Sequence, residues 1–277
     1  MNKFKHDEVN VRKSRFLSRV LMGSGPACLN GLFATLSDVL DGSLKNRIQM
    51  DGRNYGGAPI ALAPLSRGLV SDIMSVMFFG EKLSSEAEFA RNLRRHPRET
   101  VACMGAFQIL PSFLAPMAHA VLTRRGYAMH KVQDRLLREI ARIQAANEGQ
   151  PGGDKSTILN QMISLSATER EYWTPLLLSQ TVLGLWLAAS HQPWVYLNTL
   201  LVELCLRPEW QSILRDEVVQ NCPGGLEYND LERLPLLDSF MRETSRMRSL
   251  DRCEILRVCW NTPSAKFILQ LRYGERH

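Results

Sequence analysis

The stretch LERLPLLDSFMRETSR, residues 231–246, decides the fold of this chain. Its apolar residues recur at helical spacing after a proline, which predicts a helix from Pro235 to about Arg248. Glu243 and Arg246 stand three positions apart, so they share one face of this helix and can form an ion pair. A guanidinium beside a carboxylate can also hold a third partner, such as a backbone carbonyl. Such pairs are common on solvated helices, so this pair indicates a function only in combination with the sequence that precedes it.

The preceding stretch LWLAASHQPWVYLNTLLVELCLRPEWQSILRDEV, residues 185–218, predicts two further helices, the second starting at Pro208. Pro193 has no N–H to bond to the carbonyl of Ala189, so we expect a local opening of the first helix there. His191 and Gln192 lie directly before the proline, where they are candidates for a proton relay and a hydrogen-bond donor. The alternative is a proline-kinked core helix whose histidine has only a structural role.

Apolar spacing elsewhere predicts a predominantly α-helical chain. One apolar stripe ends at Gly80, a predicted helix C-cap, and another lies on a helix predicted from about residue 118 to 147. Ser166 and Glu169 form a capping-box pattern that predicts the start of a helix over about 168–205. We also expect a turn at Gly23-Ser24-Gly25, a helix cap by Asn229 and Glu232, and strand-like alternation at 267–273. The two stripes consist of Leu69, Ile73, Val76 and Met77, and of Val132, Leu136, Ile140 and Ile143.

The composition is that of an ordinary globular protein, with 45% hydrophobic residues, 22% charged residues and a net charge of +6. The cysteines include no CxxC pair, which excludes the usual zinc and iron–sulfur spacings and favours a reducing, intracellular location. The basic N-terminus lacks the apolar region of a signal peptide, and the longest apolar run, 176–189, is too short and mixed for a membrane span. The sequence therefore predicts no membrane anchor. The six cysteines are Cys28, Cys103, Cys205, Cys222, Cys253 and Cys259.

Residues 231–246 closely resemble the K helix of fungal cytochromes P-450, and residues 185–218 resemble the I and J helices of that family in order and spacing. LVSDIMSVMFFGEKL at 69–83 and FQILPSFLAPMAHAVL at 107–122 resemble earlier segments of the same family. The resemblance covers about 32–251. It implies a mainly α fold, the helical core of the family from its middle helices through the K helix. We therefore expect a basic N-terminal segment at 1–31, a helical domain at 32–251 and a divergent tail at 252–277.

The resemblance implies a heme-thiolate monooxygenase of fungal secondary metabolism, similar to the group that oxidises terpenoid and indole-diterpene skeletons. It implies heme as cofactor, NADPH-cytochrome P-450 reductase as electron donor, a small hydrophobic substrate and the endoplasmic-reticulum membrane. Glu243 and Arg246 match the pair that braces the fold beside the heme. His191 stands where the family has an acid of the oxygen-activating groove, and Gln192 where it has a threonine. Four residues of the same helix are expected to face heme and substrate: Leu183, Leu185, Trp186 and Leu187.

The sequence departs from the family at the iron ligand. Family members supply a cysteine thiolate from a Phe-x-x-Gly-x-x-x-Cys-x-Gly loop, because its electron push drives O–O cleavage. Cys253 and Cys259 follow residue 246 too closely for that loop and lack the upstream Phe-x-x-Gly. The Trp-x-x-x-Arg segment that binds a heme propionate is not recognisable either. We therefore predict no metal ligand, a truncated chain that does not bind heme by itself, and no catalytic activity.

Two alternatives stay open. The abrupt loss of resemblance near Asp251 is also what a missed intron or a frameshift would give, and the product would then be a complete monooxygenase. The other alternative is a non-catalytic helical protein that binds a hydrophobic ligand or a partner enzyme. No nucleic-acid partner is predicted, because no stacking aromatics interleave with the basic patch of Arg91, Arg94, Arg95 and Arg98. The sequence contains no G-x-S-x-G, P-loop or G-x-G-x-x-G motif.

Overall fold

The computed structural model describes residues 3–50, 61–146, 156–224 and 227–248, and in these ranges the chain is helical without a β-strand. The elements are α1 (Lys3–Met50), α2 (Leu62–Ser84), α3 (Ala87–Ile109), η1 (Ser112–Leu114), α4 (Ala115–Leu122), α5 (Tyr127–Ala146), α6 (Ile158–Ser166), η2 (Ala167–Glu169), α7 (Pro175–Leu206), α8 (Pro208–Asn221), η3 (Tyr228–Arg233) and α9 (Pro235–Met247). The predicted mainly α fold class is confirmed.

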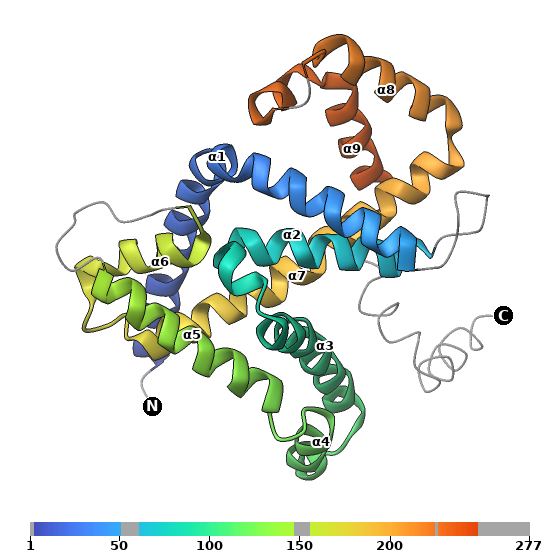
Figure 1. Ribbon diagram of the computed structural model, residues 1–277. Helices are drawn as coiled ribbons and strands as arrows, with labels where there is room; N and C mark the ends of the chain where they lie inside the picture. The colour runs from blue at the N-terminus through green and yellow to red at the C-terminus, as the bar shows by residue number, and fades with distance from the viewer. Residues whose placement is uncertain (1–2, 51–60, 147–155, 225–226, 249–277) are drawn as a thin grey trace.

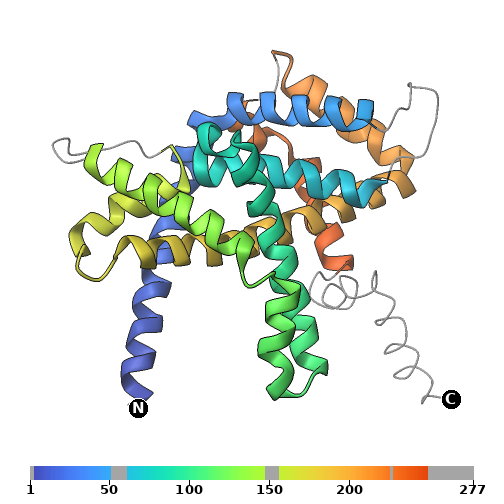
Figure 2. The same ribbon diagram turned by 60° about the horizontal axis from the view of Figure 1, so that its bottom comes forward.

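Helix α7 runs through the centre of the molecule with α2 packed along it, and α1 packs on α2 (Figure 1). Helices α3 and α5 pack together, and α4 folds back beside the last turns of α3, so that α3 and α4 project together as an arm (Figure 2). At the other side α8 and α9 pack on the C-terminal half of α7 and on each other. Helix α7 is therefore the common support of α2, α5, α8 and α9.

The core forms where α2 and α7 meet through aromatic side chains. Trp186 is fully buried, and its ring centroid lies 5.5 Å from that of Phe78 and 5.6 Å from that of Phe79. Its Nε1–H donates a hydrogen bond of 3.2 Å to the backbone carbonyl of Leu93 on α3. Phe79 in turn meets Phe89 edge to face at 5.4 Å. Because these contacts join three helices, they determine which face of α7 points inward.

Both apolar stripes predicted from the sequence face the core. Val132 and Leu136 are fully buried on α5, and Leu69 and Val76 are buried on α2. Gly80 has a φ of +78° and breaks the helical backbone within α2, which confirms a helix end at this glycine.

The single helix predicted over 118–147 is wrong, because the chain forms α4 and α5 with a break between them. Arg124, Arg125 and Gly126 all take positive φ values at this break. The Thr123 hydroxyl donates to the carbonyl of His119 at 2.7 Å and accepts from the N–H of Gly126 at 2.7 Å. This side chain therefore satisfies backbone groups where α4 ends, and the left-handed backbone that starts at Arg124 ends the helix.

The helix predicted from about residue 168 begins later, at Pro175. Thr174 is its N-cap, with a side-chain oxygen that accepts from the N–H of Leu177 at 3.3 Å. Ser166 instead ends α6, so the predicted capping box does not start this helix. Helix α7 continues through Pro193 to Leu206, so the proline does not end it.

Two other local predictions are wrong. Helix α1 runs through Gly23-Ser24-Gly25 instead of turning there, although its ribbon changes direction along its length (Figure 2). The cap of η3 comes from Glu227 and Asp230, which form a reciprocal capping box, and not from Asn229 and Glu232. The strand-like segment 267–273 lies outside the described residues.

Helix α2 has the length and apolar composition of a membrane-crossing helix. However, 44% of its most apolar window is buried within the protein, where the helix packs on α7. The role of α2 in the core is therefore sufficient to explain its composition.

We expect Trp186→Ala to destabilise the protein by about 3–5 kcal/mol, since it leaves a cavity between α2 and α7 and removes the donor to the Leu93 carbonyl. Urea unfolding followed by circular dichroism measures this change. Leu176→Ala is the control on the same helix, because this side chain is 50% exposed and its loss should cost less than about 0.5 kcal/mol. Similar losses for both variants would contradict the central role of Trp186.

Candidate functional site

One face of α7 is left uncovered by the described residues. Gln180, Gly184, Ala188 and Gln192 are exposed and follow one another at four-residue intervals, so they form a single line on the helix, here called the α7 stripe. The small side chains at its centre leave the backbone of α7 accessible. A flat molecule can therefore approach this face closely.

The opposite face of α7 contains residues that sequence reasoning placed toward heme and substrate. Leu183 is 2% exposed and Trp186 is 0% exposed, and both lie in the core against α2. Leu185 is partly buried and packs against the same core. The expectation that these residues line a heme and substrate face is therefore wrong, because α2 and its aromatic side chains cover them.

His191 and Gln192 are neighbours in sequence, but they occupy different environments. Gln192 is exposed at the end of the α7 stripe, whereas His191 is half-buried with its ring edge-on to Trp194 at 5.7 Å. Arg67 of α2 stacks over the same indole, with its guanidinium carbon 4.4 Å from the ring centroid. Burial and the nearby charge of Arg67 lower the pKa of His191 below its usual value. His191 is therefore neutral near pH 7.

Helix α9, which contains the other predicted pair, is fixed at its start by a carboxylate from α8. The Glu217 side chain is buried and accepts hydrogen bonds from the N–H groups of Leu236 at 2.6 Å and Leu237 at 2.9 Å. These N–H groups belong to the first turn of α9 and have no partner within their own helix. Glu217 thus caps α9 from outside, with its negative charge at the positive end of the helix.

The middle and the end of α9 are held by α7. The Tyr196 hydroxyl donates to the backbone carbonyl of Met241 at 2.9 Å. Glu203 is 2% exposed and accepts from Arg248 at 2.8 Å, while Arg207 pairs with its other oxygen at 3.2 Å. Because a buried carboxylate needs such partners, Glu203 ties the end of α9 to the last turns of α7.

Glu243 and Arg246 form the predicted ion pair on α9. Two hydrogen bonds of 2.6 and 2.8 Å join the guanidinium to the two carboxylate oxygens. These bonds lower the pKa of Glu243 and raise the pKa of Arg246. Both side chains are more than half exposed, so within the described residues the pair presents its outer edge to solvent. The pair lies on α9, whereas His191 and Gln192 lie on α7.

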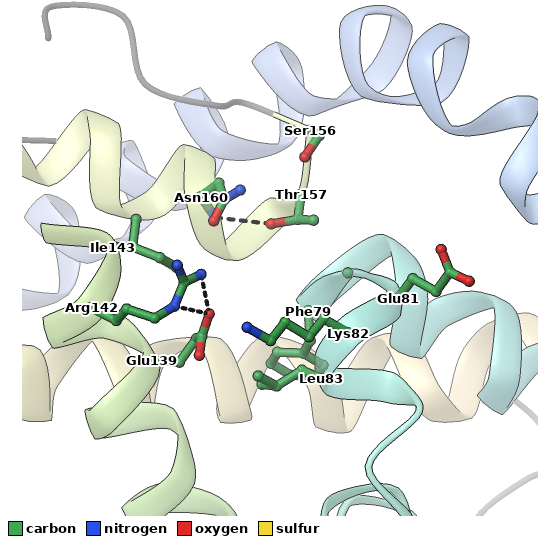
Figure 3. Close-up of a pocket in the computed structure, with 11 residues that line it drawn as sticks. Phe79, Glu81, Lys82, Leu83, Glu139, Arg142, Ile143, Ser156, Thr157 and Asn160 are labelled. Carbon is green, nitrogen blue, oxygen red and sulfur yellow. Dashed lines mark hydrogen bonds and ion pairs between the residues drawn. The ribbon is translucent and has the colours of Figure 1, made fainter. Parts of the chain in front are cut away.

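A cavity of about 240 Å³ lies elsewhere, between the end of α2, α5 and the start of α6 (Figure 3). Its apolar wall includes Phe79 and Ile143, and none of the predicted site residues lines it. Glu139 in its wall binds Arg142 at 2.5 Å and Arg135 at 3.1 Å. Burial works to raise the pKa of Glu139, but these hydrogen bonds outweigh it and lower the pKa. Both oxygens of this carboxylate are thus engaged in a structural ion-pair network.

The described residues do not fit the iron ligand of a heme. Cys103 lies buried on α3, outside the α7 stripe, and burial raises the pKa of its thiol. Cys205 lies in the last turn of α7, beyond the end of the α7 stripe, and Cys222 directly follows α8. In the parts of the chain that the structure covers, no three His, Cys, Asp or Glu side chains gather as a metal site. The α7 stripe supplies a face for a flat group, but no donor for its metal.

Sequence reasoning missed the Arg67–Trp194 stack and the two buried carboxylates that hold α9. Arg67 and Trp194 are on different helices, and 19 positions separate Glu217 from Leu236. The sequence offered one signal for the cap of α9. Glu217 is a charged residue on an otherwise apolar face of α8, near Leu214 and Val218.

The chain matches known proteins over most of its length. The family model for cytochrome P-450 matches residues 38–262. Similar curated proteins include the cytochrome P-450 monooxygenase cdmJ of Talaromyces verruculosus, 29% identical over 75% of this chain and 40% of the relative. Another is the ent-kaurene oxidase of Gibberella intermedia, 24% identical over 84% of this chain and 43% of the relative. The chain thus spans about two-fifths of the length of these relatives.

A solved structure shows the same arrangement of helices. It is a cyanobacterial protein, CYP120A1 with retinoic acid bound, and it matches with a TM-score of 0.51 at 21% identity. The match covers 85% of this chain and 48% of the other. At 21% identity, this similarity shows a shared fold and nothing about function.

We expect Glu217→Gln to destabilise α9 by about 1–3 kcal/mol, because an amide offers one acceptor oxygen to two N–H groups and no charge to the helix start. Hydrogen exchange of the Leu236 and Leu237 amides measures the local loss, and urea unfolding measures the total. Asp216→Asn, an exposed neighbour on α8, is the matched control. Unchanged exchange at both amides in the Glu217 variant would show that the cap does not hold α9.

Proposed function

The chain belongs to the cytochrome P-450 family, and we propose that it forms the helical core of a heme-thiolate monooxygenase that oxidises an apolar, terpenoid-type molecule. The observation that carries this proposal is the α7 stripe, an accessible line of small and polar residues on the central helix, with α9 docked further along the same helix. The relatives support the substrate class, since one of them is an ent-kaurene oxidase.

In this proposal Gln192 and His191 are what remains of the oxygen-activating groove. Gln192 presents an amide donor at the end of the exposed stripe. His191 is neutral near pH 7, because its pKa is lowered, and a neutral imidazole can accept a proton. Heme, when bound by a family member, supplies the activation of dioxygen that no side chain can provide.

Glu243 and Arg246 are proposed as a structural brace. The pair is preformed on α9, and its outer edge is accessible for a third partner. We keep the division into a basic segment 1–31, a helical domain 32–251 and a tail 252–277 as part of the proposal. Family members generally draw electrons from a redox partner, and we propose NADPH-cytochrome P-450 reductase for this protein.

A reduced, carbon-monoxide difference spectrum of the chain, expressed with excess heme precursor, tests the site. We expect no thiolate-type Soret band from the 277-residue chain alone, because its sequence lacks the Phe-x-x-Gly-x-x-x-Cys-x-Gly loop that supplies the thiolate in the family. A thiolate-type band at stoichiometric heme would contradict this expectation, and Cys253→Ala and Cys259→Ala would then identify the ligand.

Any preparation that shows the band also tests the substrate class. With reductase, NADPH and a diterpene hydrocarbon, it should give an oxygenated product in mass spectrometry. A band without such a product would overturn the proposed terpenoid-type oxidation.

We further propose that the arm of α3 and α4 contacts a lipid surface, in keeping with the membrane association of fungal family members. Its end exposes large apolar side chains: Phe113 is 77% exposed, Val121 72%, and Ile109 and Met117 64% each. Arg124 and Arg125 follow directly and are exposed. Apolar side chains with basic neighbours fit a membrane that contains anionic lipids.

The double variant Phe113→Glu, Val121→Glu should bind vesicles of phosphatidylcholine and phosphatidylserine at least about tenfold more weakly in co-sedimentation. The reason is that each apolar side chain contributes about 1.5–3 kcal/mol when it is buried. The matched control places glutamate at Leu206 and Val219, which are 63% and 65% exposed on α7 and α8. Equal weakening by both double variants would argue against a specific lipid-binding arm.

A further inference from the structure

The cavity between α2, α5 and α6 is separate from the α7 stripe, because none of the described residues that line it belongs to α7 (Figure 3). Its volume of about 240 Å³ holds about eight water molecules, since a water molecule takes about 30 Å³ in the liquid. Ligand sites in proteins combine such a space with an apolar wall and a few polar groups. The volume therefore suits a small organic molecule.

The wall that α2 contributes to the cavity is apolar. Phe79 and Leu83 are 6% and 1% exposed, and they line the cavity from the two sides of the break at Gly80. Ile143 of α5 also lines the cavity and packs against the same core. An apolar group that enters the cavity therefore meets a surface that the packing of the core holds in place.

A positive charge faces this apolar wall. The Lys82 side chain points its ammonium group into the cavity, whereas the carboxylate of its neighbour Glu81 points away (Figure 3). Among the described residues, no carboxylate lies within 4 Å of the Lys82 ammonium. An ammonium group beside an apolar surface attracts an acceptor that carries a negative charge.

The other charged groups at this place balance one another. Glu139 binds both Arg142 and Arg135, and Arg135 also binds Glu86 at 2.6 Å. These two arginines and two glutamates have no net charge, so Lys82 supplies the excess positive charge that faces the cavity. Arg142 uses its Nε and Nη2 atoms on Glu139, at 2.9 and 2.5 Å, which leaves Nη1 as a donor for a further acceptor.

We propose that this cavity binds a small apolar carboxylate. The carboxylate lies between the Lys82 ammonium and Nη1 of Arg142, and the apolar body lies against Phe79, Leu83 and Ile143. This inference goes beyond the proposed function, because the site shares no residue with the α7 stripe, with the pair of Glu243 and Arg246, or with His191 and Gln192.

A titration of the heme-free, 277-residue protein at pH 7, followed by its backbone amide signals in NMR, tests the site. The probes are cyclohexanecarboxylate and cyclohexanecarboxamide, which have the same apolar ring and differ in charge. We expect the carboxylate to bind at least about tenfold more tightly, as is typical of a charge-assisted hydrogen bond. The amide signals of Gly80, Lys82 and Thr157 should move, since these residues line the cavity.

Lys82→Gln should abolish most of the preference for the carboxylate and leave carboxamide binding unchanged. This side chain is exposed, so its substitution leaves the core intact. Lys45→Gln is the matched control, because Lys45 is an exposed lysine of α1 that does not line the cavity. Ile143→Phe reduces the space and should weaken both probes alike, and circular dichroism shows whether each variant keeps its helices.

Equal affinity for the two probes would overturn the proposal, as would signal changes confined to amides away from the cavity. The same conclusion follows if Lys82→Gln and Lys45→Gln alter the preference equally. Failure of the protein to take up heme or to oxidise a diterpene leaves these binding results unaffected, so the two proposals can fail separately.

Discussion

The packing of α2 against α7 is the contact on which the rest of the structure depends. Trp186 fills the interface, touches Phe78 and Phe79, and reaches α3 through its hydrogen bond to Leu93. A helix as apolar as α7 can turn several faces toward a core, and this interface selects one of them. The selection leaves Gly184, Ala188 and Gln192 outside, and the stripe they form exists because α2 occupies the other side.

A second constraint holds α9 in place, and it is electrostatic. Glu217 and Glu203 are both buried; Glu217 binds two N–H groups of α9, and Glu203 binds Arg248 at the end of α9 and Arg207 at the end of α7. A buried carboxylate without partners costs free energy, so its hydrogen-bond donors must stay at defined positions. Apolar packing sets no such requirement on direction. These contacts give the exposed pair of Glu243 and Arg246 a fixed position relative to α7, as the proposed role of the pair requires.

The sequence predicted the helical class, the stripes on α2 and α5, and the range of α9, because each follows from local spacing. It failed where the outcome depends on distant residues. Leu183 and Trp186 were expected beside a heme, but on a helix that is apolar all around only the partner α2 decides which side is core. The break before Gly126 depends on the side chain of Thr123, and the cap by Glu217 joins two helices that spacing alone cannot relate. His191 and Gln192 were found by resemblance, and their roles remain proposals.

The α2–α7 interface also has a consequence for synthesis on the ribosome. The apolar face of α2 is complete at Ser84, and 90 residues, 85–174, must be added before the first residue of α7. At a translation rate of about 5–20 residues per second, this face waits roughly 5–18 s for its partner. During that interval a helix with the composition of a membrane span is exposed in the nascent chain. The apolar face of α2 is therefore open to non-native contacts until the core that covers it can form.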